Sequence, residues 1–175
     1  MAVERDTGVL WTWGCNENGK LGQGHHLENT SLPASIDPAT FYDNVAQAAA
    51  AAADAAGIQH SYVDDVVVSV VGGSDHTMAV TVAGVLWGCG NGLESQRGSG
   101  NRNVVSTFER VGGEDYFGIG GVRMVSCHQK QTLIVARQYH VGVPCTAVDY
   151  AGHSERTTSW RRVDAVATPC GAFRL

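Results

Sequence analysis

Short apolar runs alternate with glycine-rich polar segments along the first two thirds of the chain. The first run, 8–14, includes Trp11 and Trp13 and has the apolar and aromatic composition of a buried strand. It leads into a segment rich in Asn and Gly, residues that tolerate the positive φ angles of tight turns. Leu21 is the large apolar side chain of that segment, so we expect it to pack beneath the turn. The pattern predicts a buried strand followed by a glycine-rich turn.

The same pattern returns downstream at a constant offset. Gly84-Val85-Leu86-Trp87 repeats Gly8-Val9-Leu10-Trp11. Gly90, Gly98 and Gly100 then fall where Gly14, Gly22 and Gly24 would be copied. A shared offset that includes a four-residue identity indicates internal repetition, which fixes the architecture before any local assignment. The sequence therefore predicts a repeat protein.

A second repeated element lies between and after these copies. Residues 66–80 are typical of a valine-rich strand, a tight turn and another strand, and the turn contains Gly73 and His76. A weaker copy covers 122–135, where Gln131 replaces the histidine. We interpret the repeat unit as an aromatic strand, a glycine-rich turn, a long connection and an apolar strand–turn–strand.

These residues resemble the repeat of the regulator of chromosome condensation family, the RCC1-like propellers. The resemblance is carried by a tryptophan strand, an Asn and Gly turn, and a Gly-x-x-His turn, and its signature residues are Trp11, Trp13, Gly14, Asn16, Gly19, Leu21, Gly22, Gly24, Gly73, His76, Trp87 and Gly90. The second copy departs from the pattern, because Ser95 and Arg97 replace the glycine and leucine of its turn. The resemblance implies an all-β fold, a partial propeller arc of two to three blades with a short Ala-rich helical insertion.

The resemblance divides the chain into a lead and two or three repeats. We expect a lead at 1–7, a first repeat at 8–82 with a helical insertion at about 43–57, a second repeat at 83–136, and a degraded third repeat or C-terminal extension at 137–175. Asp43 or Asn44 would cap the insertion. Tyr139-His140-Val141 would open a third copy, and 161–167 would supply its valine strand. An open arc leaves unpaired sheet edges, which favours a fragment, a bound partner or self-association.

Composition and charge narrow the function classes. The chain of 175 residues is 43% hydrophobic and 17% charged, as a globular protein would be. Its formal charge of -5 disfavours direct binding of nucleic acid through a broad basic surface. No apolar run approaches the ~20 residues that span a bilayer, and the lead lacks the apolar core of a signal peptide. We expect an intracellular protein, cytoplasmic or nuclear, with five reduced cysteines and no membrane contact.

Three sequence patterns resemble catalytic or metal-binding motifs but lack residues or spacings that such sites need. Residues 14–20 match the Gly-x-x-x-x-Gly-Lys spacing of a phosphate-binding loop, but Leu21 stands where a magnesium-binding hydroxyl is needed. The histidines and cysteines show none of the spacings typical of zinc sites, and His76 is better explained as closing its turn. His153-Ser154-Glu155 is a run of neighbours, not the spatial arrangement of a catalytic triad. We predict no catalytic residue, metal or cofactor.

The remaining chemistry favours protein binding. Trp11, Trp13 and Trp87 are interpreted as packing between blades, with a binding platform as the alternative. Functional residues of repeat proteins lie mostly in loops. The candidate partner-binding loops contain His25, His26, Glu28 and Asn29 in the first repeat and Asn101, Arg102 and Asn103 in the second. We predict a non-catalytic protein–protein interaction module; the alternative, implied by the resemblance, is a guanine-nucleotide exchange factor-like regulator of a small Ran-type GTPase.

Overall fold

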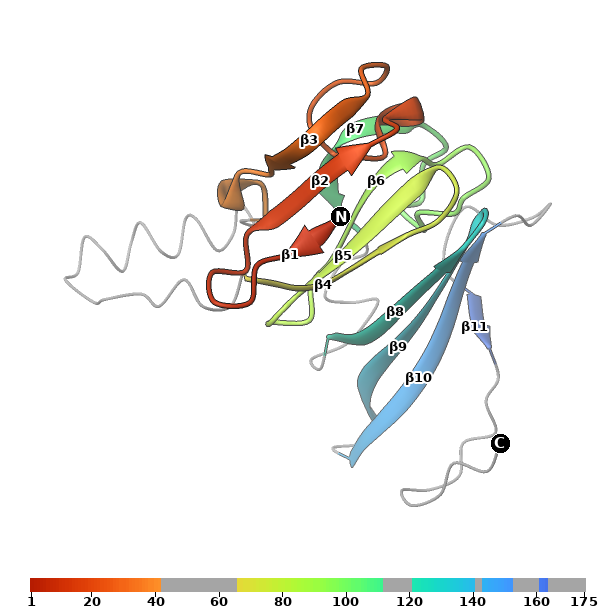
Figure 1. Ribbon diagram of the computed structural model, residues 1–175. Coiled ribbons are helices and arrows are strands. Elements are labelled where there is room, and N and C mark those ends of the chain that lie inside the picture. The colour runs from red at the N-terminus through yellow and green to blue at the C-terminus, as the bar shows by residue number, and fades with distance from the viewer. Residues whose placement is uncertain (42–65, 112–120, 141–142, 153–160, 164–175) are drawn as a thin grey trace, which may run out of the picture.

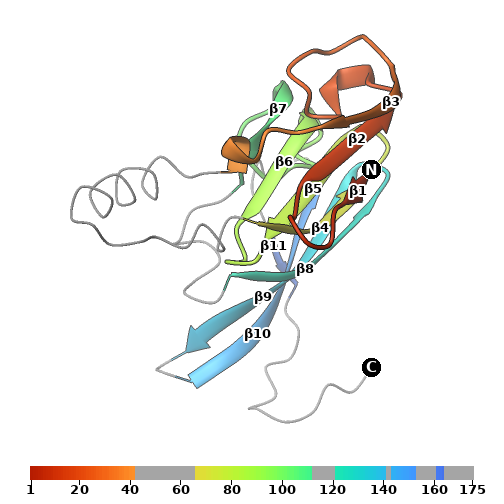
Figure 2. The ribbon, with the colours of Figure 1, turned by 60° about the vertical axis from the view of Figure 1, so that its left-hand side comes forward.

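The chain folds into three antiparallel sheets set side by side as an open fan (Figures 1 and 2). The structure is a computed structural model, and it describes residues 1–41, 66–111, 121–140, 143–152 and 161–163. In chain order we call the sheets sheet 1, sheet 2 and sheet 3. Sheet 2 lies between the other two in both views. The predicted all-β fold is confirmed.

Each sheet is built of strands that follow one another in the chain. Sheet 1 has the order β1-β2-β3, with β1 Ala2–Val3, β2 Leu10–Gly14 and β3 Thr30–Ser35. Sheet 2 has the order β4-β5-β6-β7, with β4 Val67–Gly72, β5 His76–Thr81, β6 Leu86–Asn91 and β7 Val104–Arg110. Sheet 3 has the order β11-β10-β9-β8, with β8 Val122–His128, β9 Gln131–His140, β10 Val143–Gly152 and β11 Arg161–Val163. Two short 3-10 turns, η1 Glu17–Gly19 and η2 Pro38–Phe41, flank β3.

The sheets are offset from the sequence repeats. In sheet 2, β4 and β5 come from the predicted first repeat and β6 and β7 from the second. In sheet 3, β8 and β9 begin in the second repeat, whereas β10 and β11 come from the segment after it. Each of these sheets thus joins the end of one repeat to the beginning of the next, which ties neighbouring repeats together. The proposed domain boundaries stay a prediction.

The first strand of sheet 1 is a short copy of β5. Met1-Ala2-Val3 has the same sequence as Met78-Ala79-Val80. Ala2 pairs with Trp11 and Val3 with Leu10, as Ala79 pairs with Trp87 and Val80 with Leu86 in sheet 2. Identical tripeptides therefore occupy identical register positions, so the faces of sheets 1 and 2 can be matched residue by residue.

A first apolar core fills the space between sheets 1 and 2. Leu10, Ile36 and Phe41 come from the sheet 1 side; Val67, Ala79, Trp87, Cys89, Val105 and Phe108 come from sheet 2. The Phe41 ring meets Trp87 edge-on, with ring centroids 5.6 Å apart. Such aromatic contacts add to the free energy of burial. This core therefore holds sheet 1 against one face of sheet 2.

A second core joins sheets 2 and 3. Its buried residues are Met78, Val80, Leu86 and Val111 from sheet 2 and its flank, and Val122, Val125, Ile134 and Ala136 from sheet 3. Because one face of sheet 2 packs on each neighbour, β5 is buried along its whole length. Sheet 2 is the central layer of the fan (Figure 1).

Three predictions concern the parts around these sheets. The helical insertion at about 43–57 lies outside the described residues. Tyr139 and His140 lie at the end of β9, which pairs with β10, and the third copy predicted to open there stays a prediction. The valine strand predicted at 161–167 overlaps β11, but β11 pairs with β10 as the edge strand of sheet 3, the place that β7 holds in sheet 2, and not the place of the valine strands β4 and β8.

Candidate functional site

Asn16 organises the first glycine-rich loop. Its side chain is fully buried and donates from Nδ2 to the His25 carbonyl at 2.8 Å, while Oδ1 accepts from the Leu21 amide at 3.0 Å. Its backbone amide donates to Asn29 Oδ1 at 2.9 Å. Leu21 is 4% exposed, so the predicted packing of this side chain beneath the turn is confirmed. One buried amide therefore fixes both ends of the loop.

The second loop keeps the same backbone with different side chains. The amide of Gly19 donates to the Asn16 carbonyl and that of Gly22 to the Gly19 carbonyl. At the matching positions the Ser95 amide donates to the Gly92 carbonyl and the Gly98 amide to the Ser95 carbonyl. The positive φ of Gly19, 70°, is matched by Ser95, at 60°. The loop conformation therefore survives the loss of its glycine.

Arg97 takes the place of Leu21 beneath the second loop. Its side chain is fully buried and lies 3.4 Å from the Glu109 carboxylate. Its Nη2 donates to Asn101 Oδ1 at 3.1 Å and to both the carbonyl and the side chain of Asn103. Burial lowers the pKa of Arg97, and Glu109 opposes that shift. A charged anchor thus does in the second loop what an apolar side chain does in the first.

Equivalent threonines fasten each loop to the adjoining strands. Thr77 Oγ1 donates to the Lys20 carbonyl at 2.7 Å, across from sheet 2 to the first loop. Thr132 Oγ1 donates to the Gln96 carbonyl, also at 2.7 Å, across from sheet 3 to the second loop. Lys20 and Gln96 occupy matching positions in the two loops. The sheet-to-loop contact is therefore repeated along the arc.

His76 links two sheets, which corrects the expectation that its side chain closes its own turn. The turn is closed by backbone, because the Gly73 amide donates to the His76 carbonyl at 2.8 Å. The His76 side chain lies 2.8 Å, Nε2 to Oγ1, from Thr132 in sheet 3. The Thr132 hydroxyl donates its hydrogen to the Gln96 carbonyl, so it must accept a hydrogen bond from the N–H at Nε2 of His76. The partner lies far away in sequence, so local spacing could not reveal it.

Burial keeps His76 neutral. Desolvation lowers the pKa of His76 to about 4, with Asp75 opposing and Arg97 adding to the decrease. The other ring nitrogen, Nδ1, is buried and has no hydrogen-bond partner among the described residues. A neutral ring with one bonded nitrogen suits a structural clamp between sheets.

The Gly-x-x-x-x-Gly-Lys spacing does not build a phosphate cradle. Residues 17–19 form a 3-10 turn, and the Lys20 ammonium donates to the Ser74 carbonyl at 3.0 Å and lies 3.8 Å from Asp75. A helix N-terminus and an available cation are what phosphate binding requires. Lys20 is instead part of the contact between the first loop and the turn that follows β4.

The described residues hold no cluster of metal-ligand type. No three His, Cys, Asp or Glu side chains among them gather as a metal site would need. Burial raises the pKa of the Cys89 thiol well above its usual range, and it raises the pKa of the Cys127 thiol to about 11. Both thiols therefore stay protonated at neutral pH and are poor nucleophiles. No helix in the described part is long and apolar enough to cross a membrane.

The predicted loop residues divide into those that hydrogen-bond a buried anchor, Asn16 or Arg97, and those that do not. His25 and Asn29 bond Asn16, and Asn101 and Asn103 bond Arg97, as described above. Of these four, only His25 is partly buried; Asn29, Asn101 and Asn103 are exposed, as are the remaining members His26, Glu28 and Arg102. Leu27, between His26 and Glu28, is 84% exposed. His26 and Arg102 hold matching positions in their loops, so the arc repeats one design: a buried anchor followed by an exposed residue.

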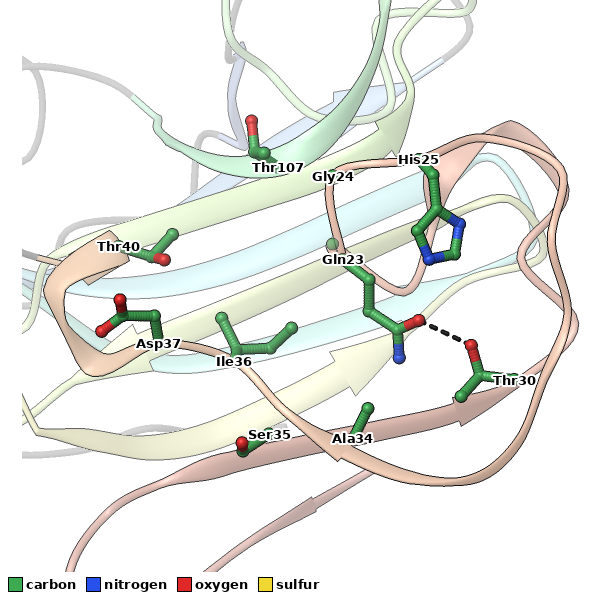
Figure 3. A pocket seen from close by; sticks show the side chains of 11 residues that line it. Gln23, Gly24, His25, Thr30, Ala34, Ser35, Ile36, Asp37, Thr40 and Thr107 are labelled. Atoms are coloured by element: carbon green, nitrogen blue, oxygen red, sulfur yellow. Dashed lines mark hydrogen bonds between the residues drawn. The ribbon is translucent and has the colours of Figure 1, made fainter.

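A shallow groove lies between the first loop, β3 and η2, and Thr107 of β7 also lines it. Its volume is about 520 Å³, and its lining includes Gln23, Thr30, Asp37, Thr40 and Thr107 (Figure 3). The Gln23 amide donates to the carbonyl and the hydroxyl of Thr12, and it accepts from Thr30 Oγ1 at 2.6 Å. The amide facing the groove is therefore committed to holding the loop.

The tryptophans do not share one environment. Trp87 is 6% exposed in the core between sheets 1 and 2, as predicted. Trp13 is 38% exposed and Trp11 is half-buried, so the expectation that all three pack between blades is wrong for Trp11 and Trp13. The reason is register: Trp11 and Trp13 lie on the face of sheet 1 that points away from sheet 2.

Sequence reasoning missed two kinds of residue. Leu27 and Leu32 are 84% and 74% exposed, and nothing in their local pattern separates them from core leucines. Arg97 was noted only as a departure from the repeat, although it is the anchor of the second loop. The signal in the sequence was that Arg97 holds the repeat position of Leu21, which was expected to be buried beneath its loop.

Comparisons with known proteins bear on these loops and sheets. The sequence model of the regulator of chromosome condensation (RCC1) repeat matches residues 7–54, the stretch that holds the first glycine-rich loop. Similarity to the RCC1 repeat is thus shown for about the first third of the chain. A mouse protein named RCC1-like G exchanging factor-like protein is 39% identical over 62 residues, which are 35% of this chain and 13% of the mouse protein.

Solved structures resemble the fold of this chain. Human WBSCR16 superposes over 91% of this chain and 34% of its own, with a TM-score of 0.58 and 19% identity. Prp20p from Saccharomyces cerevisiae covers 91% of this chain and 35% of its own, with a TM-score of 0.60 and 12% identity. The fold is thus a partial RCC1-like β-propeller arc, and the chain spans about a third of the length of these propellers.

Proposed function

We propose that this chain is a non-catalytic protein-interaction module and that its exposed loop residues contact a protein partner. The observation that carries the proposal is the repeated loop design, in which a buried anchor presents His26, Leu27 and Glu28 from one loop and Arg102 from the next. Rigidly held loops with exposed apolar and charged side chains are typical of binding surfaces. An intracellular location, in cytoplasm or nucleus, is part of the same proposal.

Related proteins support a protein partner. Prp20p was described together with its binding to Gsp1p and histones, and yeast RCC1 (Prp20) was solved bound to Kap60. These partners are reported for those proteins, of which this chain matches about a third. They favour proteins, and not small molecules, as the class of ligand for the loops of this chain.

The test compares two variants in affinity capture from cell extract. The loop variant changes His26, Leu27 and Glu28 to Ala together. The control changes Val82, which is 49% exposed in the turn between β5 and β6, to Ala. We expect at least one protein to be captured by the unaltered chain and by the control and lost from the loop variant. Equal capture by all three proteins, or no specific capture by a folded chain, would contradict the proposal.

A second candidate is exchange-factor-like regulation of a small Ran-type GTPase. The observation that favours it is the matching mouse protein, which is named as exchanging factor-like. The test is the release of a fluorescent guanine nucleotide from a Ran-type GTPase, with and without the chain. Acceleration that is lost with Arg102→Ala and kept with Val82→Ala would support this function, whereas no acceleration would remove it.

A further inference from the structure

The two faces of sheet 2 make two different contacts. The face that we call the front face points to the preceding sheet and carries Trp87 and Cys89. The face that we call the back face points to the following sheet and carries Met78, Val80 and Leu86. All five residues are at most 6% exposed. A front face and a back face are therefore the two halves of every contact between neighbouring sheets in this arc.

The front face of sheet 1 is the uncovered counterpart of that of sheet 2. Trp11 matches Trp87 by register, since Ala2 pairs with one as Ala79 pairs with the other. Trp13 holds the position of Cys89, one residue before the matching Gly14 and Gly90. Cys89 is fully buried, whereas Trp13 is 38% exposed. The two indole rings of sheet 1 thus lie on an exposed face, whereas the matching face of sheet 2 is covered by the neighbouring sheet.

At the other end of the fan, the back face of sheet 3 exposes apolar side chains in its described part, on β8 and the first half of β9. Leu133 follows Thr132 as Met78 follows Thr77, and the two threonines make the same bond to the preceding loop. Met78 is fully buried, but Leu133 is 41% exposed. Met124, which pairs with Val135 on the same face, is 64% exposed. Figure 1 shows sheets 1 and 3 at opposite ends of the fan.

We propose that copies of this chain associate head to tail, the back face of sheet 3 of one copy packing on the front face of sheet 1 of a second. The contact between a back face and a front face occurs twice within the chain. Each chain also exposes one further face of each kind, so a second copy supplies the matching face for either of them. The exposed groups suit one another, because Met and Leu side chains pack well on indole rings. The inference goes beyond the loop contacts proposed above and does not depend on them.

The geometry predicts an assembly of a particular symmetry class. A front face meets a back face, so the contact is heterologous and each copy uses two different surfaces. Such contacts generate rings where the rotation closes and open chains where it does not. They do not generate dimers with a twofold axis through the contact.

Light scattering after size-exclusion chromatography tests the proposal over a wide range of concentration. Trp13→Glu places a charge on the front face of sheet 1, and Leu133→Glu places one on the back face of sheet 3. Val82→Glu, at a comparably exposed position in a turn, is the control. We expect the unaltered chain and the control at two chain masses or more, and each face variant alone at one chain mass.

Mixing the two face variants distinguishes head-to-tail from like-to-like contacts. Trp13→Glu keeps a good back face and Leu133→Glu keeps a good front face, so the equimolar mixture should return to two chain masses and no higher. Association of either variant by itself at the mass of the unaltered chain would show a like-to-like or unrelated contact and overturn the proposal. An unaltered chain at one chain mass throughout would overturn it as well.

Milder variants guard against loss of folding. Trp13→Ser and Met124→Glu alter the same two faces at exposed positions, and circular dichroism with thermal melting verifies the fold of every variant. These two should also be single chains alone and paired when mixed. The loop variant His26→Ala/Leu27→Ala/Glu28→Ala should keep the mass of the unaltered chain, so partner binding and self-association fail separately.

Discussion

Among single residues, His76 and Ser95 have buried environments with clear consequences for the stability of the fold. His76, at 0% exposure, lies between sheets 2 and 3, and Ser95, at 2% exposure, lies in the second glycine-rich loop. His76 donates across to Thr132. Ser95 has a positive φ of 60° and a buried hydroxyl with no partner among the described residues. One residue ties sheets together, and the other carries a local cost.

The neutral His76 ring makes stability depend on pH. The pKa of His76 is about 4 when folded and 6.5 when exposed, so the unfolded chain binds more protons between these values. Stability from this residue is present above pH 6.5 and is lost as the pH falls towards 4, on the order of 2 kcal/mol between pH 7 and pH 5. Urea unfolding at both pH values should show a smaller loss for His76→Gln than for the unaltered chain. Equal losses would contradict this assignment.

Replacing Ser95 by glycine should stabilise the protein. Glycine adopts positive φ without strain, and the substitution also removes a buried hydroxyl without a partner. After the entropy cost of glycine, we expect a gain of about 1 kcal/mol in the free energy of unfolding. Ser74→Gly, at an exposed serine outside the positive-φ residues, is the control and should be neutral or destabilising. A lower melting temperature for Ser95→Gly would show that the hydroxyl has a stabilising partner.

At the scale of elements, the glycine-rich loop is the unit that repeats. Both copies make the same backbone hydrogen bonds, although one is anchored by Asn16 and Leu21 and the other by Arg97. Backbone geometry and the threonine bonds to Lys20 and Gln96 are therefore the shared part of the element. The anchors differ because several side chains can fill the same space beneath one loop.

Two glycines of the first loop separate conformational from steric requirements. Both have positive φ, 72° at Gly22 and 88° at Gly24. A Cβ at Gly22 would overlap the Phe108 ring, whereas one at Gly24 would meet open space. We expect Gly24→Ala to cost about 1 kcal/mol for its backbone and Gly22→Ala to cost roughly 1–3 kcal/mol more for the displaced ring. Denaturant midpoints should show this order; equal costs would mean that Phe108 moves aside freely.

At the scale of the whole molecule, sheet 2 is the central layer. Strands β5 and β6 are buried on both faces, whereas the described side chains of sheets 1 and 3 include exposed apolar residues on one face, Trp13 in sheet 1 and Met124 and Leu133 in sheet 3. Local opening should therefore cost most free energy in sheet 2. In a chain held below its association range, hydrogen exchange should be slowest at the paired amides of β5 and β6 and fastest at those of β1 and β3. Uniform protection across the sheets would contradict a fan with a central layer.

Much of this architecture could be predicted from the sequence, because the features that specify it are local. Alternating apolar strands and glycines at positive φ determine where the chain extends and where it turns. The constant offset between Trp11 and Trp87 revealed the repeat, and the Leu21 position was correctly expected to be buried. The loops with exposed His26 and Arg102 followed from their place after those turns. These conclusions need only the chemistry of neighbouring residues.

Tertiary structure decided which copy of a pattern is buried and what each buried group contacts. Trp87 and Trp13 come from the same aromatic strand pattern, but only the first faces a neighbouring sheet. His76 and Thr132 belong to different repeats, and Arg97 is an anchor only because Asn101, Asn103 and Glu109 surround it. Burial and hydrogen bonding depend on segments that are distant in the chain, so they cannot be predicted from the local sequence pattern. The repeat is therefore a property of the sequence, and its exposed faces are a property of the fold.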